Sequence, residues 1–229
     1  MVEKKNISIS IDGPSASGKS TIAKILAKRL GYIYIDTGAM YRAFTLACLN
    51  NDINCEDEKA CCSLIGKIEI GFNDLNHVTL NGIDVENEIR KNNVADNVSY
   101  IASYKDIRLD LVNQQRKLAE NNNVIMDGRD IGTYVLPNAN VKIFQIADVK
   151  ERARRRYLEN LEKGIQTTYE ECLANLEKRD YIDSHRSFSP LKPAIDSIEI
   201  NTTNLGINEV SNMIIALLKE RGIVSKNEQ

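Results

Sequence analysis

The sequence contains few of the features that mark membrane, secreted or fibrous proteins. It has 4 Pro and 12 Gly among 229 residues, too few of either for a collagen-like or low-complexity chain. Its longest apolar stretches, such as 213–218, are far shorter than the ~20 residues that a transmembrane helix needs. Residues 1–11 are polar with alternating apolar side chains, and they contain no apolar core of the kind found in a signal peptide. We therefore expect a globular protein of the cytoplasm that does not bind membranes.

The sequence also lacks an excess of charge of either sign. Lys and Arg together number 30, and Asp and Glu number 32, which gives a net charge of -2. Such a balance provides no overall attraction to nucleic acid, so we expect no nucleic-acid partner. Any site for an anion must therefore be built locally.

Cysteine and histidine are too few and too scattered to predict a metal site. The cysteines form no C-x-x-C pair, and only His77 and His185 could join them as ligands. We interpret the cysteines as reduced and mostly buried thiols. They are Cys48, Cys55, Cys61, Cys62 and Cys172.

A strand, a glycine-rich loop and a helix follow one another near the start of the chain. Serines alternate with Ile7, Ile9 and Ile11, which is a strand pattern. Apolar residues then recur at helical spacing over 22–30, and Gly31 stands where a C-terminal cap belongs. The sequence between them matches G-x4-G-K-S, in which backbone N–H groups at a helix N-terminus hold phosphates. We expect ATP to bind this loop, whose residues are Gly13, Pro14, Ser15, Ala16, Ser17, Gly18, Lys19, Ser20 and Thr21.

Two side chains of the loop and one distant aspartate have expected roles in phosphate chemistry. Lys19 is expected to reach the β and γ phosphates, and the Ser20 hydroxyl to bind Mg²⁺. Asp127 ends the apolar run 124–127, where a carboxylate beside the metal is found in proteins with this loop. Because apolar strands often end in Asp, a purely structural role for Asp127 stays open. The sequence thus predicts Ser20 and Asp127 as metal ligands.

Short apolar runs elsewhere predict the strands of a sheet. Helical patterns separate these runs, which is typical of a parallel sheet with helices on both faces. Capping-box spacing predicts helices that begin after Asp148 and Thr168, and a last helix is expected over 208–221. The strands are expected at 32–35, 124–127, 141–146 and 198–200.

One stretch departs from the alternation of strand and helix. Apolar residues alternate between 66 and 86 and flank Asn81 and Gly82. Asn-Gly between alternating apolar residues is the strongest short signal for a β-hairpin. We therefore predict a small antiparallel insert in the α/β domain.

Other classes of protein with a phosphate loop are excluded by the absence of their second motif. The N-K-x-D of GTPases and the L-S-G-G-Q of transporter ATPases do not occur. A small-molecule kinase remains, and such an enzyme needs arginines to hold the phosphate of its acceptor. Within the run 152–156, helical geometry places Arg152 and Arg156 on one face and Arg154 elsewhere, so only part of the run should reach a site. A solvated helix face is the alternative for this run.

Three further motifs resemble those of bacterial cytidylate kinases. They are D-T-G-A-M-Y-R at 36–42, D-G-R-D at 127–130, and R-D-x-x-D-S-x-R at 179–186 with S-P-L at 189–191. The resemblance runs in the same order from Ile7 to about Leu218. It implies a P-loop kinase fold with a five-stranded parallel sheet, in one domain of residues 1–229. It also implies a nucleotide-binding insert at 64–93 and a helical lid at about 150–190.

The resemblance also implies an activity and a set of site residues. The activity is transfer of the γ-phosphoryl group of ATP to CMP or dCMP, with Mg²⁺ accompanying ATP. Lys19, Arg129 and Arg186 would be catalytic. Ser99, Arg108 and Asp130 would read cytosine, and Arg179 and Asp183 would approach the sugar. The complete set implied for CMP is Thr37, Tyr41, Arg42, Ser99, Arg108, Asp127, Arg129, Asp130, Arg179, Asp183 and Arg186.

Several alternatives stay open at this level. A kinase that prefers UMP, or a nucleotide-binding regulatory protein that transfers no phosphate, would share the loop. Tyr41 could serve packing alone, and Asp130 could merely orient Arg129 through a salt bridge. A monomer is expected because no long apolar surface stripe is evident.

Overall fold

Two separate hydrophobic cores organise the computed structural model, which describes residues 6–224. Each core belongs to one of two units. The first unit contains the described residues up to Ile35, Leu118–His185 and those from Ser189 onward. The second unit contains Asp36–Lys117 and Arg186–Phe188. Among the described residues, no helix has the length and apolar character that crossing a membrane requires.

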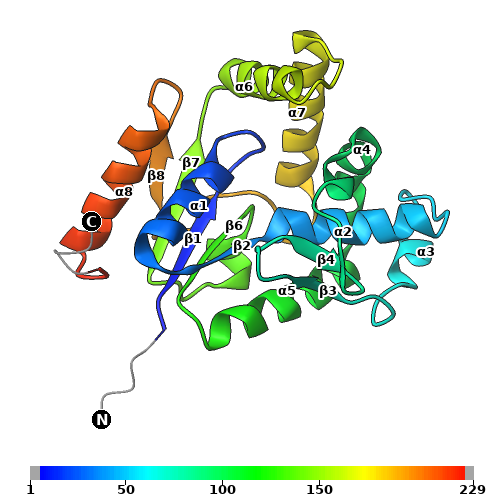
Figure 1. The fold of residues 1–229 in the computed structure, drawn as a ribbon, viewed down its shortest axis with the longest axis horizontal. Coiled ribbons are helices and arrows are strands. Elements are labelled where there is room, and N and C mark those ends of the chain that lie inside the picture. Colours follow the sequence, from blue (N-terminus) through cyan, green and yellow to red (C-terminus); the bar gives the residue numbers. More distant parts are fainter. Residues whose placement is uncertain (1–5, 225–229) are drawn as a thin grey trace. The chain divides into compact units, whose positions relative to one another are not determined.

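The first unit is built on a five-stranded sheet with the order β2-β6-β1-β7-β8 (Figure 1). β1 pairs in parallel with both β6 and β7, and β7 pairs in parallel with β8. Every residue of β6 is buried, as expected for a strand covered on both faces. The predicted parallel fold is therefore confirmed. The strands are β1 (Ser8–Asp12), β2 (Ile33–Asp36), β6 (Val124–Gly128), β7 (Val141–Ile146) and β8 (Ile198–Asn201).

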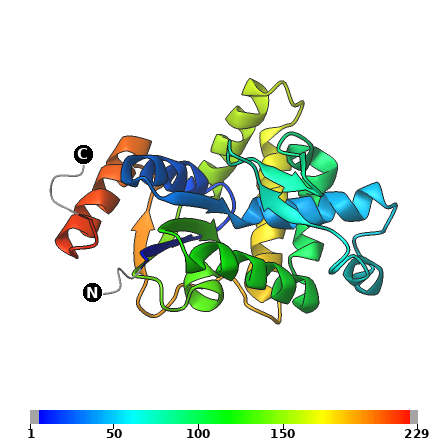
Figure 2. The ribbon, with the colours of Figure 1, turned by 60° about the horizontal axis from the view of Figure 1, so that its bottom comes forward.

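Helices complete the core of the first unit. α1 (Lys19–Leu30) and α8 (Ile207–Glu220) lie side by side, and both contribute apolar side chains to the core around β1 (Figure 2). As predicted, α1 ends at Gly31, which has a φ of 65° and donates its N–H to the Ala27 carbonyl. α6 (Val149–Glu162) and α7 (Tyr169–His185) pack against each other.

The two predicted capping boxes differ in the structure. Thr168 and Glu171 form a complete box, because each side chain accepts the other residue's backbone N–H. Asp148 caps α6 as expected by accepting from the Lys150 and Glu151 N–H groups. The Glu151 carboxylate does not complete that box, because it pairs with Arg154 and Arg155 at 2.8 and 2.9 Å. Two guanidinium groups thus replace a single backbone N–H as the partners of this carboxylate.

The second unit contains a small antiparallel sheet of β3 (Ile70–Phe72), β4 (Val78–Leu80) and β5 (Ile83–Asp84). Asn81 and Gly82 join β4 to β5 with φ angles of 52° and 78°, the left-handed pair that a tight hairpin needs. The hairpin prediction is confirmed. The helical segments of this unit are α2 (Thr37–Asn50), α3 (Glu58–Cys62), η1 (Glu88–Arg90), α4 (Asn92–Ile101) and most of α5 (Lys105–Glu120).

The cysteines lie as the sequence predicts. Cys48, Cys55 and Cys61 are buried in the second core, and Cys172 is also buried. Burial raises the pKa of the Cys55 thiol to about 11, and the neighbouring Cys61 adds to that rise. Thiols in this environment stay protonated and behave as small apolar side chains.

Candidate active site

The glycine-rich loop between β1 and α1 has a backbone that only glycine fits at its first position. Gly13 has a φ of 154°, and a Cβ there would collide with the main-chain carbonyl of Gln145. Gly18 has a φ of 90° and immediately precedes α1. The first N–H groups of α1 have no partners within the helix, so the loop and the helix end together favour a bound anion. Lys19 lies at this end, is 6% exposed, and donates from Nζ to the Pro14 carbonyl at 3.1 Å.

Donors from the rest of the first unit orient the carbonyls of this loop. The Ser17 carbonyl accepts from Gln145 Nε2 at 2.6 Å and from Thr202 Oγ1 at 3.1 Å. Arg152 Nη1 donates to the Ser15 carbonyl at 3.1 Å. Because a peptide unit is planar, a carbonyl fixed toward these donors turns the following N–H in the opposite direction. The loop is thus held with N–H groups directed away from its protein partners.

Ser20 and Asp127 meet at the carboxyl ends of the strands. Ser20 Oγ donates to Asp127 Oδ2 at 2.6 Å, and the Tyr34 hydroxyl donates to Asp127 Oδ1 at 2.8 Å. Asp127 is only 3% exposed. A hydroxyl and a carboxylate are hard oxygen donors of the kind that Mg²⁺ prefers, with its remaining positions taken by water and phosphate. The residues therefore fit the predicted metal.

Asp12, at the end of β1, is a buried carboxylate that the sequence analysis did not single out. Its two oxygens accept the backbone N–H groups of Ile131 at 2.8 Å and Gly132 at 2.7 Å. Burial raises its pKa to about 7, and the nearby Asp130 charge adds to the rise while these hydrogen bonds and Lys19 oppose it. Asp12 thereby fixes the main chain just after Arg129 and Asp130 at the start of η2 (Ile131–Val135).

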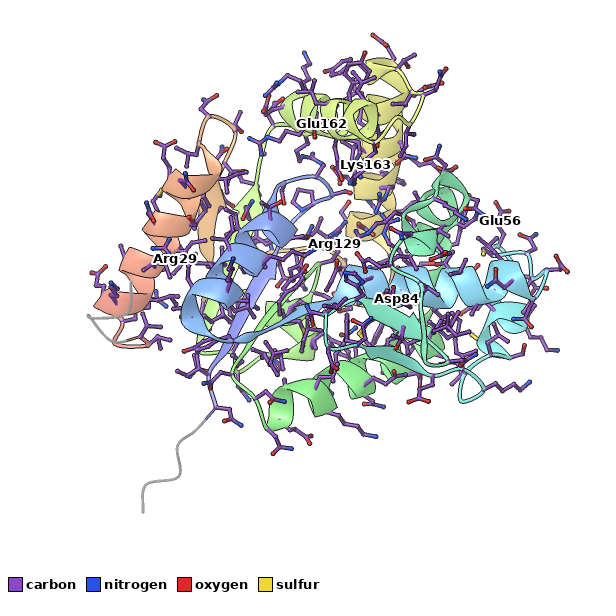
Figure 3. All side chains as sticks on the ribbon, in the orientation of Figure 1. Arg29, Glu56, Asp84, Arg129, Glu162 and Lys163 are labelled. Atoms are coloured by element: carbon purple, nitrogen blue, oxygen red, sulfur yellow. The ribbon has the colours of Figure 1, made fainter. Side chains whose placement is uncertain are left out.

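Arg129 and Asp183 form an ion pair between the turn after β6 and α7. Arg129 Nε donates to Asp183 Oδ2 at 2.7 Å, and Asp183 is 5% exposed. Figure 3 shows Arg129 beside the C-terminal part of α7. Burial opposes the charge of Arg129, but Asp183, with smaller contributions from the charges of Asp180 and Asp127, raises the pKa of the guanidinium. The carboxylate that orients Arg129 is therefore Asp183.

Arg179 lies near this pair, and its surroundings destabilise its charged form. Burial and the charge of Arg129 lower its pKa to about 10. Its Nε has no hydrogen-bond partner among residues 6–224. Two guanidinium groups close enough to repel each other favour an anion between or beside them.

Asp130 is held by a side chain far along the sequence. Ser189 Oγ donates to Asp130 Oδ2 at 2.5 Å. Asp130 is 4% exposed, and its carbonyl accepts the Tyr134 N–H at 2.8 Å. Both its main chain and its carboxylate are thus fixed within the first unit.

In the second unit, Tyr41, Arg108 and Arg186 share one small region. The Arg108 guanidinium lies over the Tyr41 ring at 5.2 Å from its centroid. Arg108 Nη1 donates to the Ala102 carbonyl at 2.9 Å, and Arg186 Nη1 approaches the same carbonyl at 3.4 Å. Tyr41 therefore does more than fill space, because its ring face stabilises a buried cation.

The other predicted residues of the second unit lie on α2 and α4. Arg42 donates to the Ile89 carbonyl at 3.2 Å. Thr37 is buried at the start of α2, where the Asp36 side chain caps the helix by accepting the Ala39 N–H at 2.9 Å. Ser99 is buried on α4.

As expected, only part of the arginine run of α6 reaches the phosphate loop. Arg152 reaches the loop, as expected, and also pairs with Asp180 at 2.7 Å. Arg156 instead pairs with Glu159 at 3.4 Å, while Arg155 contacts Ser17 and the Thr202 carbonyl. Residues at i and i+3 also share a helix face, so Arg155 can reach the phosphate loop together with Arg152. Arg154 points elsewhere, as predicted, and pairs with Glu151.

Comparison with known proteins decides the family. A model of the family described as cytidylate kinase matches residues 9–220. The chain belongs to the cytidylate kinase family. A cytidylate kinase of Fusobacterium nucleatum is 53% identical over 91% of this chain and 95% of its own length. One of Leuconostoc mesenteroides is 51% identical, over 93% of this chain and 97% of its own. One of Bacillus subtilis is 46% identical, over 95% and 99%.

A solved structure supports the fold of this cytidylate kinase family member. An uncharacterized protein from Eubacterium ventriosum superposes with a TM-score of 0.52 at 16% identity, covering 94% of this chain and 99% of that one. At this identity the likeness concerns the fold alone. The resemblance drawn from the three motifs and the predicted α/β architecture are both confirmed.

Proposed function

We propose that the protein transfers the γ-phosphoryl group of ATP to CMP or dCMP and releases ADP with CDP or dCDP. The observation that carries the proposal is the phosphate loop with the Ser20 and Asp127 pair beside it, in a chain of the cytidylate kinase family. The family implies an ATP-dependent kinase, and the loop supplies the kind of backbone that binds nucleoside triphosphates.

ATP would bind through residues 13–21, with Lys19 toward its β and γ phosphates. Mg²⁺ would be held by Ser20 and Asp127, and it neutralises charge that spreads over the phosphoryl group during transfer. Ser20 and Asp127, which lie within hydrogen-bond distance of each other, would both hold the metal. Tyr34 would keep Asp127 oriented, because its hydroxyl contacts the other carboxylate oxygen.

The acceptor needs no general base. The phosphate of CMP is largely dianionic at pH 7, since the second pKa of such monoesters is ~6. The work of the protein is then to align two polyanions and to neutralise their repulsion. We assign the acceptor phosphate to Arg42, Arg129 and Arg186, and the sugar to Arg179 and Asp183. Thr37 and Tyr41 would line the acceptor site.

Base recognition is assigned to Asp130, Arg108 and Ser99. Cytosine presents an amino donor at C4 and an acceptor at N3, whereas uracil presents a carbonyl and an N–H at these positions. A carboxylate facing the amino group and a guanidinium facing N3 match cytosine and oppose uracil. A site discriminates strongly against a ligand that leaves the buried polar groups of the site unpaired, as uracil would here.

The larger segments have corresponding roles in this proposal. Residues 64–93 would serve as the insert for the nucleoside monophosphate and about 150–190 as a lid that excludes water from the reacting groups. All of them belong to one catalytic domain. We further propose a monomer that works in the cytoplasm on ATP, CMP and dCMP, without nucleic-acid or membrane partners.

A coupled assay of ADP release with CMP, dCMP, UMP and AMP tests the proposed function. We expect turnover with CMP and dCMP to exceed turnover with UMP and AMP by orders of magnitude. Faster turnover with UMP would identify a UMP kinase. Tight binding of ATP without release of ADP under any condition would identify a regulatory protein.

A further inference from the structure

A serine outside the predicted site holds the carboxylate that we assign to base recognition. We propose that Ser189 is a positioning residue for Asp130 and thereby sets the preference for cytosine over uracil. This inference rests on the proposed function, because it requires Asp130 to face the base. The observation behind it is the 2.5 Å hydrogen bond from Ser189 Oγ to Asp130 Oδ2.

The rest of Asp130 is already fixed by the main chain. Its carbonyl accepts the Tyr134 N–H at 2.8 Å, and Asp12 binds the next two N–H groups along the chain, those of Ile131 and Gly132. The remaining freedom of the residue is rotation of the carboxylate, which is a broad and weakly restrained torsion. The Ser189 hydroxyl holds one oxygen of this carboxylate at 2.5 Å and thereby restrains that rotation.

Ser189 occupies a backbone conformation that is unfavourable for serine. Its φ is 52°, in the left-handed region that glycine and asparagine adopt more readily. The following residues tie it in place, because the Leu191 N–H donates to the Asp183 carbonyl at 2.8 Å. Strained backbone conformations cluster at functional sites, so this conformation supports a role for the Ser189 side chain. Glycine would relax the backbone but would lack the hydroxyl.

The fixed orientation matters most for rejecting uracil. The amino group of cytosine attracts a carboxylate from any nearby orientation, whereas the carbonyl of uracil repels it only if the carboxylate cannot turn away. Losing the Ser189 hydroxyl should therefore raise kcat/KM for UMP and lower it modestly for CMP. A merely structural serine would change both substrates equally.

The test compares kcat/KM for CMP and UMP in the full-length Ser189→Gly and Ser189→Ala proteins. Loss of a hydrogen bond to a charged group predicts a CMP-to-UMP ratio about tenfold lower in both variants. Thermal unfolding should show Ser189→Gly to be the more stable of the two, since it relaxes the backbone. Ser189→Asn, which tolerates a left-handed φ and carries a donor, should recover part of the ratio.

Two further variants separate this inference from its foundations. Ser197→Ala removes a hydroxyl that donates to the Ala194 carbonyl at 2.6 Å in the same connecting segment, and it should leave the ratio unchanged. Asp130→Asn should lower the ratio further than either Ser189 variant. An unchanged ratio in Ser189→Gly, or an equal fall in Ser197→Ala, would overturn the role of Ser189 while leaving CMP kinase activity in place. Failure of the wild-type protein to phosphorylate CMP would overturn the proposed function itself.

Discussion

Two arginines of the first unit and three of the second contact different kinds of group. In the first unit, carboxylates hold Arg129 and Arg152 in ion pairs of 2.7 Å, through Asp183 and Asp180. In the second unit, main-chain carbonyls accept from Arg42, Arg108 and Arg186, and an aromatic face supports Arg108. A carboxylate both positions and neutralises a guanidinium, whereas a carbonyl positions it through a neutral partner.

The two kinds of partner should affect the stability of the protein differently. Breaking an ion pair that is shielded from water leaves a charge without its partner, so such a pair links function to stability. Loss of a hydrogen bond from a guanidinium to a main-chain carbonyl lowers the free energy of unfolding far less. We therefore expect the ion pairs of Arg129 and Arg152 to support both folding and activity, and the carbonyl contact of Arg42 to contribute less to stability.

The largest expected effect is that of Lys19→Ala. The side chain lies at the anion-binding end of α1, so its removal should lower kcat by at least about a thousandfold while the protein stays folded. Steady-state kinetics and thermal unfolding check this together. Near-normal turnover by a folded Lys19→Ala protein would contradict the assigned role of the loop.

Asp130→Asn should have the next largest effect, on specificity rather than on rate. An amide in place of the carboxylate can turn its N–H₂ group toward the uracil carbonyl, so the ratio of kcat/KM for CMP to UMP should fall by up to about 10⁴-fold. Kinetics with both nucleotides measure this ratio. An equal loss for both substrates would show that Asp130 supports the local structure and does not read the base.

Arg129→Ala and Arg42→Ala sharpen the comparison of the two units most directly. Both should weaken CMP phosphate capture by about 2–3 kcal/mol, as expected for a charge-assisted bond. Arg129→Ala removes the 2.7 Å ion pair of the buried Asp183 carboxylate, so it should also lower the free energy of unfolding by about 3 kcal/mol. Arg42→Ala should lower it by about 1 kcal/mol.

Urea unfolding of these two variants beside the wild type provides the measurement. Equal losses of stability would remove the distinction between the units. Wild-type kinetics for CMP in both variants would show that the acceptor phosphate binds elsewhere.

Asp12 should make the free energy of unfolding depend on pH. Its native pKa of about 7 lies above the ordinary value of 3.8, so the folded protein holds the proton more tightly than the unfolded chain. Its stabilising contribution is therefore complete below about pH 4 and is lost as the pH rises through 7. The loss is at most about 1.4 kcal/mol per pH unit.

Asp12→Asn should be less stable at every pH, because the side-chain N–H₂ would face a backbone N–H in place of an accepting oxygen. Because asparagine does not titrate, the stability of this variant should also lack the slope with pH. Urea unfolding of both proteins between pH 5 and pH 8 compares the slopes. Parallel curves would show that Asp12 is ionised across this range.

Sequence patterns predicted the parts of the fold that depend on neighbouring residues. Strands such as Val141–Ile146 are continuous apolar runs, and Asn81-Gly82 demands one kind of turn. The phosphate loop is equally local as a sequence motif, and its glycines adopt positive φ angles of 154° at Gly13 and 90° at Gly18. The family motifs then extended the prediction to residues such as Asp130.

The residues that support the site could not be predicted, because their roles come from contacts between distant parts of the chain. Asp12 binds N–H groups 119 and 120 residues away, and Ser189 reaches Asp130 across 59 residues. Gln145 contacts the loop carbonyl at Ser17 from 128 residues away. No periodicity or spacing marks such partners. A short polar residue at the end of a buried strand, as Asp12 is, gives a local signal.

The most direct test of the account follows the phosphorus atom itself. The purified protein is incubated with CMP and ATP labelled at the γ-phosphate, and the labelled products are separated. We predict that the label appears in CDP, in an amount equal to the ADP released, and that omission of CMP removes most of the release. Label recovered as inorganic phosphate, with none in CDP, would contradict the assignment of this chain as a kinase acting on CMP.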